Sequence, residues 1–101
     1  MKILVTGATG NTGSEVTRQL LAAGHAVRVL AHSADSAAKL PDGVEIQMGD
    51  FDDASALAAA FNGVEAAYAL TPVNPKSAEW MQRLVDVAQN CGVRRFVKLS
   101  G

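Results

Sequence analysis

The chain has 101 residues, of which 49% are hydrophobic and 19% charged, which is typical of one globular domain with a core and excludes a disordered chain. Nine basic and ten acidic side chains give a formal charge of -1, which argues against nucleic acid or an anionic membrane as a partner. Cys91 is the single cysteine and cannot form a disulfide within the chain, and no apolar run is long enough to span a bilayer. These features predict a cytoplasmic protein.

Five short apolar runs end in polar or glycine signals and are predicted to be β-strands. They cover residues 2–5, 26–31, 44–48, 65–70 and 96–99. The fourth run is rich in alanine, and its own preference is ambiguous, but Asn62-Gly63 and Thr71-Pro72 mark its two ends as turns. We therefore expect a strand there as well.

Four stretches between these strands have helical patterns, over residues 12–23, 33–40, 54–61 and 75–90. In the first, Val16, Leu20 and Ala23 share one face, and Gly24 suits the left-handed position after a helix. The second is short and ends at a Pro-Asp-Gly turn over residues 41–43. The pattern thus predicts one helix in each connection between strands.

The fourth helix has the clearest start and the clearest apolar face. Asn74 is the predicted cap and Pro75 the first helical residue, because the fixed φ of proline suits that position. Apolar residues recur at helical spacing and comprise Trp80, Leu84, Val87 and Cys91. We expect Trp80 and Met81 to pack or half-pack, and Cys91 to fill the last turn as a small hydrophobic residue.

Strands and helices alternate along the whole chain, without an internal repeat or a linker. This alternation predicts an α/β fold in which a doubly wound parallel sheet lies between two layers of helices. Since nearly continuous apolar strands are typical of burial on both faces, we expect the sheet to be covered on both sides. Right-handed crossovers favour the strand order 3-2-1-4-5, with a ligand crevice between the first and fourth strands.

The loop after the first strand reads TGATGNTG over residues 6–13 and leads directly into the first helix. In this context, glycines at i, i+3 and i+6 predict a phosphate-binding loop, and they exceed what a flexible turn requires. We expect Gly7 to form the tight turn, Gly10 to let the backbone approach a pyrophosphate, and Gly13 to let the helix pack closely on the strand. Further candidate contacts are Thr9, Asn11 and Thr12, of which the last two can instead cap the helix.

The start of the chain, MKILVTGATGNTG over residues 1–13, resembles the atypical short-chain dehydrogenase/reductases, in particular the NmrA-like NAD(P)-binding group that includes quinone reductases. The similarity continues through GDFDD at 49–53, LTP at 70–72 and VRRFVKLS at 93–100, and so covers the whole chain. It implies a Rossmann fold. It also implies that residues 1–101 are an NAD(P)-binding domain from the N-terminal part of a longer family fold.

The resemblance implies further contacts with the dinucleotide. Asp50 would accept a hydrogen bond from the adenine amino group, and the Phe51 backbone would contact the ring, just beyond a strand end where ligands bind in open α/β sheets. Asp50 can equally cap the next helix, and capping is the favoured role of Asp52 and Asp53. The residues that would line the crevice near the pyrophosphate and nicotinamide ribose, unless they form an ordinary strand exit, are Leu70, Thr71 and Pro72.

The end of the second strand bears on the choice of cofactor. An NAD site normally has an acid there, about 20 residues beyond the glycine loop, that holds the ribose 2′-OH. This chain has His32 and Ser33 at that place, and the nearest acid, Asp35, lies beyond the strand. His32 stands where many NmrA-like relatives have arginine, and both side chains can donate to a 2′-phosphate. We therefore expect NADP, with NAD as the alternative.

The sequence does not identify the catalytic residues. Related tyrosine-dependent reductases use a Tyr and a Lys four residues later, but Tyr68 is the only tyrosine and Pro72 stands four residues after it. Ser100 occupies the place of the serine that such enzymes have after the fifth strand, and is the one candidate. No metal site is predicted.

The resemblance implies that the complete protein reduces a quinone or a similar small carbonyl acceptor with NAD(P)H. One alternative is a non-enzymatic dinucleotide sensor that acts on a protein partner, and another is a folding module without useful binding. The open edge of the fifth strand, residues 96–99, is in addition a predicted site of self-association, because unpaired edges template pairing with another chain.

Overall fold

The computed structural model describes residues 2–7, 11–31, 34–38, 40, 42–70 and 75–98, and strands alternate with helices throughout them. The strands are β1 (Lys2–Thr6), β2 (Ala26–Ala31), β3 (Glu45–Met48), β4 (Ala66–Ala69) and β5 (Arg95–Lys98). The helices are α1 (Asn11–Ala22), α2 (Ala34–Ala38), α3 (Ala54–Phe61) and α4 (Ser77–Asn90). Within these residues, no helix has the length and apolar character that crossing a membrane requires.

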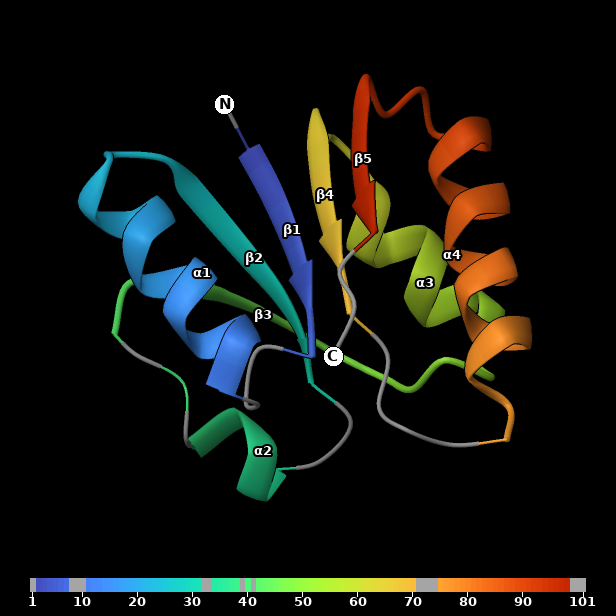
Figure 1. Cartoon of the computed structure of the whole chain (residues 1–101), viewed down its shortest axis with the longest axis horizontal. Coiled ribbons are helices and arrows are strands. Elements are labelled where there is room, and N and C mark those ends of the chain that lie inside the picture. The colour runs from blue at the N-terminus through green and yellow to red at the C-terminus, as the bar shows by residue number, and fades with distance from the viewer. Residues whose placement is uncertain are drawn as a thin grey trace.

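The strands form one parallel sheet in the order β3-β2-β1-β4-β5, which confirms the predicted α/β fold and strand order (Figure 1). In the register, Thr6 of β1 lies opposite Leu30 of β2, and Val5 lies opposite Tyr68 of β4. The chain runs outward from β1 to β3 and then crosses over to β4, so the strand order reverses between β1 and β4. Because the strands are parallel, their carboxyl ends share one edge of the sheet (Figure 1).

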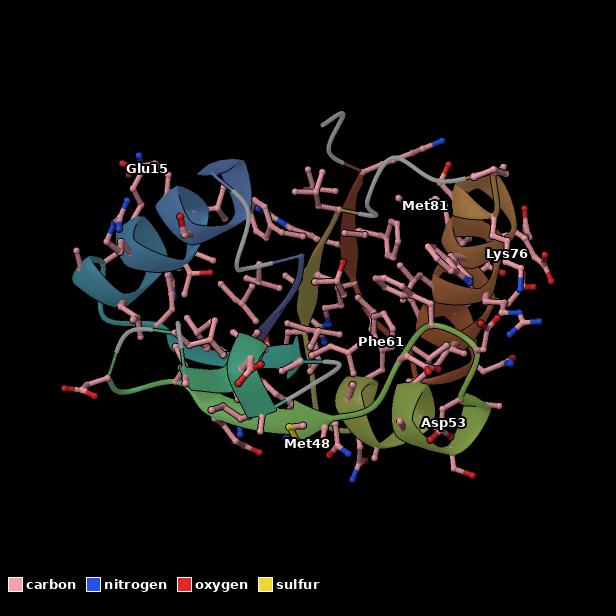
Figure 2. All side chains as sticks on the ribbon, turned by 90° about the horizontal axis from the view of Figure 1, so that it is seen from below. Glu15, Met48, Asp53, Phe61, Lys76 and Met81 are labelled. Atoms are coloured by element: carbon pink, nitrogen blue, oxygen red, sulfur yellow. The ribbon has the colours of Figure 1, made fainter. Side chains whose placement is uncertain are left out.

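Helices lie on both sides of the sheet, and the core has two parts (Figure 2). On one face, α3 and α4 pack against the sheet around fully buried side chains, the largest of which are Leu4, Leu57, Phe61 and Leu84. On the other face, α1 contributes partly buried side chains to a cluster centred on Val5, Val27 and Val29. Leu21 takes the place predicted for Ala23, which lies beyond the last helical residue and is exposed.

The two edge strands are less covered than predicted. Ile46 and Met48 of β3 are 42% and 46% exposed, and Val97 of β5 is 38% exposed. Figure 2 shows Met48 at the outside of the molecule, whereas Phe61 lies inside. An edge strand has a neighbour on one side only, so an apolar run in β3 or β5 does not imply burial on both faces.

Helix α4 begins later than predicted, and its buried face contains Leu84 and, partly buried, Val87 of the predicted set. Lys76 precedes its first turn, and Pro75 lies in the turn before the helix, because the fixed φ of proline suits a turn as well as a helix start. The predicted cap, Asn74, lies outside the described residues. The buried residues of α4 are Met81, Leu84 and Ala88. Trp80 is half-buried, and Cys91 is exposed beyond the end of the helix rather than packed in its last turn.

Candidate functional site

One buried hydroxyl group joins the carboxyl ends of β1 and β4. Thr6 Oγ1 donates to the Leu70 carbonyl oxygen and accepts from the Leu70 amide nitrogen, with both distances 2.9 Å. Both residues are buried, so water does not compete for these bonds. The two strand ends are thereby fixed at the place where the strand order reverses, which is where open α/β sheets bind ligands.

Gly7 leads the chain from β1 into the following loop. Its φ is +69°, in the left-handed region that favours glycine. A Cβ at this position would lie 2.8 Å from the Leu70 carbonyl oxygen, so the two backbones approach too closely for a side chain. Gly7 thus forms the tight turn that the sequence predicts, while its contact with a cofactor stays a prediction.

Helix α1 starts next after this loop, at the carboxyl edge of the sheet (Figure 1). Its first turn contains Asn11, Thr12 and Gly13, and the backbone N–H groups of a first turn have no partner within the helix. Such groups bind phosphate at helix amino ends. Gly13 is buried, and Thr17 Oγ1 donates to its carbonyl oxygen at 2.8 Å, which braces the first turn.

The exit from β3 lies at the same edge of the sheet. The Gly49 amide donates to the carbonyl oxygen of Ala31, the last residue of β2, at 2.9 Å. Gly49 has a φ of +150°, and a Cβ there would overlap the Ala56 side chain on α3. Glycine therefore lets the chain turn from β3 directly over the first turn of α3.

Three neighbouring carboxylates after this turn have three different partners. Asp50 Oδ1 accepts from the Asp52 amide at 2.9 Å, which closes a local turn. Asp53 caps α3, because its Oδ1 accepts from the Ala56 amide at 3.1 Å. The capping predicted for Asp53 is thus confirmed, whereas Asp50 does not cap the helix.

The prediction that Asp52 caps α3 is wrong, because this carboxylate is directed at α4. Asp52 Oδ1 accepts from Trp80 Nε1 at 3.2 Å and from Arg83 Nη1 at 3.1 Å. The neighbouring ring of Phe51 stacks on Trp80, with 5.2 Å between the ring centroids. The Phe51 side chain is therefore engaged with the protein, and the predicted contact with adenine is left to its backbone.

Several predicted site residues lie outside the described part of the chain, namely Thr9, Gly10, His32, Ser33, Thr71, Pro72 and Ser100. Among the described ones, Gly7 and Leu70 are brought together, while Asp50 and Phe51 follow β3 at the same edge of the sheet. Tyr68 lies within β4 and packs against the Val5 cluster, as its place in the predicted strand indicates.

The carboxylates with clearly lowered pKa values belong to surface ion pairs rather than to this edge of the sheet. Hydrogen bonds from Arg18 and then Gln19 hold the pKa of Glu15 below its ordinary value. The hydrogen bond from the Lys2 ammonium lowers the pKa of Glu45 most, and Arg28 lowers it further. Over the described residues, no group of three or more His, Cys, Asp or Glu side chains is placed to hold a metal ion.

Comparisons with known proteins agree with this arrangement. Residues 7–101 match a family model described as NAD(P)H-binding. The chain is 34% identical over 111 residues to an NmrA-like family domain-containing oxidoreductase of Aspergillus hancockii. This alignment covers 98% of this chain and 33% of that protein. The NmrA-like resemblance is thereby confirmed.

Solved structures give the same fold. A short-chain dehydrogenase/reductase superfamily protein of Agrobacterium tumefaciens with bound NAD has a TM-score of 0.80 at 32% identity, over 100% of this chain and 33% of that one. An NADPH-dependent quinone oxidoreductase of Escherichia coli, complexed with NADPH, has a TM-score of 0.84 at 25% identity, over 95% of this chain and 35% of that one. The chain thus spans about a third of the length of these relatives.

Proposed function

This chain belongs to the NAD(P)H-binding family, and we propose that it supplies the cofactor site of an oxidoreductase that reduces a quinone or a related carbonyl compound with NADPH. When bound, the reduced nicotinamide supplies a hydride, and a quinone that takes up this hydride and a proton becomes a hydroquinone. In this proposal residues 1–101 bind and orient the dinucleotide. The proposal places the substrate-binding groups outside these residues, because this chain matches about a third of the length of the related structures.

The observation that carries the proposal is the closed junction of β1 and β4. Thr6 fixes the two strand ends at the reversal of strand order, and Gly7 turns the chain there without a side chain. The amino end of α1 follows at the same edge of the sheet. A pyrophosphate at this edge would meet the backbone N–H groups of Asn11, Thr12 and Gly13 and the positive end of the helix dipole. The backbone contacts then come from Gly7, Gly10 and Gly13.

The adenosine end of the cofactor would lie toward the exit of β3, where the Asp50 carboxylate would accept a hydrogen bond from the adenine amino group. The end of β2 lies at the same edge of the sheet, because the Gly49 amide donates a hydrogen bond to the Ala31 carbonyl oxygen. His32 and Ser33 follow Ala31 in the chain and would donate to a ribose 2′-phosphate. Since no acid stands there to select the 2′-OH, NADP is the proposed cofactor rather than NAD.

The test is a calorimetric titration of the chain with NADPH and with NADH. We expect NADPH to bind more tightly than NADH, and weakly in absolute terms, because the chain spans about a third of its relatives. Loss of contacts to the nicotinamide half, at about 1.4 kcal/mol for each tenfold in affinity, would move a micromolar site toward millimolar.

A matched pair of variants locates the binding. Gly10→Val places methyl groups where the backbone would approach the pyrophosphate, so it should abolish binding with a modest loss of stability. Ala58→Val adds the same methyl groups at an exposed position of α3 and should leave binding unchanged. If Gly10→Val and the wild type bind NADPH with equal affinity, the proposal is contradicted, and the glycine loop serves only as a turn.

A further inference from the structure

The turn after β3 is attached to a helix that follows it by about 30 residues in the chain. Trp80 Nε1 and Arg83 Nη1 both donate to Asp52 Oδ1, at 3.2 and 3.1 Å. Arg83 Nη1 also lies 3.4 Å from the Phe51 carbonyl oxygen, so this guanidinium contacts both the side chain of Asp52 and the backbone of the residue before it. We call these residues, Phe51, Asp52, Trp80 and Arg83, the α4 clamp.

The α4 clamp is braced by an aromatic contact and by an ion pair. The rings of Phe51 and Trp80 are stacked with an interplanar angle of 28°, and Phe51 packs against the buried core on the α4 face of the sheet. Arg83 Nη2 is held by Glu79 Oε1 at 3.0 Å, one helical turn earlier. The ion pair with Glu79 on the same helix therefore orients the Arg83 guanidinium toward the turn after β3.

The clamp acts on Asp50 through Asp52. The Asp52 amide donates to Asp50 Oδ1, so the backbone of Asp52 orients the Asp50 carboxylate while its side chain is anchored on α4. The hydrogen bond from the Asp52 amide uses Oδ1 of Asp50. In the proposed function the same carboxylate accepts from the adenine amino group. Moving Asp52 away from α4 would move the carboxylate that the proposed function assigns to the adenine amino group.

We propose that Trp80 and Arg83 are positioning residues for adenine recognition, although neither contacts the nucleotide. This inference rests on the proposed function, because it requires a dinucleotide with its adenine at Asp50. A turn held in its binding geometry binds more tightly than one that must be ordered on binding. The clamp therefore sets how well the site distinguishes adenine from a base that lacks the 6-amino group.

The test compares NADH with its reduced hypoxanthine analogue, in which a carbonyl oxygen replaces the 6-amino group of the base. Calorimetric titration of the wild type should show about tenfold tighter binding of NADH, which corresponds to about 1.4 kcal/mol. In Arg83→Met the ratio of the two affinities should fall toward one. A variant that only loosened the fold would weaken both ligands alike and leave this ratio unchanged.

Three further variants define the effect. Gln82→Met removes an exposed hydrogen bond to Asp86 on the same helix and should keep the wild-type ratio. Arg83→Lys keeps a cation that can reach Asp52, so it should restore part of the preference for NADH. Asp52→Ala removes the accepting carboxylate directly, and it tests the clamp should Arg83→Met fail to fold.

The outcomes separate the two proposals. An unchanged ratio in Arg83→Met or in Asp52→Ala overturns the positioning role and leaves dinucleotide binding intact. Equal binding of both ligands by the wild type also overturns it, because the amino group is then not recognised. If the wild type binds neither of these ligands nor NADPH, the proposed function fails and the positioning role fails with it.

Discussion

Replacing Arg28 with methionine should destabilise the fold at a point remote from the proposed site. Arg28 Nη1 lies 3.1, 2.8 and 2.8 Å from the carbonyl oxygens of Ala59, Ala60 and Asn62, at the carboxyl end of α3. Carbonyls in the last turn of a helix have no partner within the helix, and a cation is favoured beside them. This side chain, 11% exposed, therefore acts as a cap that reaches α3 from β2.

The expected loss follows from which of these carbonyls water can reach. The bonds to Ala59 and Asn62 are exposed, so water replaces Arg28 there at small cost, and the bond to Ala60 is partly buried. A hydrogen bond from a charged donor contributes about 1.5–3 kcal/mol. The cation at the helix end adds about 0.3–1 kcal/mol. Together we expect about 2–4 kcal/mol, which lowers Tm by at least about 8 °C in a chain of this size.

Urea unfolding followed by circular dichroism measures this loss, with the free energy of unfolding taken at an unchanged m value. Arg18→Met is the matched control, because Arg18 pairs with Glu15 on the surface of α1 and is 62% exposed. We expect a far smaller change for it, and an intermediate one for Arg28→Lys, whose ammonium bonds fewer carbonyls. If Arg28→Met and Arg18→Met unfold at the same urea concentration, the capping argument is wrong.

Gly7→Ala forces a side chain into a positive φ and against the Leu70 carbonyl oxygen, and should cost about 1–3 kcal/mol in urea unfolding. The lowered pKa of Glu45 stabilises the fold above the ordinary pKa of 4.5, and this stability is lost as the pH falls through the lowered pKa, so Glu45→Gln should flatten the acid limb of the pH–stability curve. The open edge of β5 should give concentration-dependent association in sedimentation, weakened in Val97→Lys, whereas a monomer at every concentration would argue against it. The chain should not consume NADPH with a panel of quinones, and robust turnover lost in Ser100→Ala would contradict this expectation, because a general acid supplies about 10² to 10⁴-fold and no Tyr-Lys pair is present.

The order of the sheet was predictable because it depends on the alternation of elements and on the handedness of crossovers, both of which are visible in the sequence. β2 and α3 also have their predicted bounds, and Asn62-Gly63 marks the end of α3. The contact between α4 and the turn after β3 was not predictable in this way. Trp80 and Arg83 of α4 donate hydrogen bonds to Asp52, and no local pattern encodes a contact between residues this far apart.

In the candidate site, too, the local features were predictable from the sequence and the contacts between distant residues were not. The turn at Gly7 follows from the spacing of the glycines, whereas the bridging role of Thr6 depends on how β1 and β4 are aligned. A threonine directly before the first glycine was the one available signal. The nearby carboxylates of residues 50, 52 and 53 look equivalent as sequence, but each has a different partner. Asp50 accepts from the backbone of its own turn, Asp53 from α3, and Asp52 from α4. Sequence alone therefore identifies the edge of the sheet and not the function of each side chain.

Chemical-shift mapping of the labelled chain with NADPH tests whether a dinucleotide binds across the carboxyl ends of β1 and β3. We predict that the largest backbone amide shifts occur at Gly7, Gly13 and Asp50. The exposed positions on the two edge strands, Ile46 of β3 and Val97 of β5, should stay unchanged. Saturable shifts confined to these exposed positions of the two edge strands, or no shifts at millimolar NADPH, would show that the dinucleotide does not bind across those carboxyl ends.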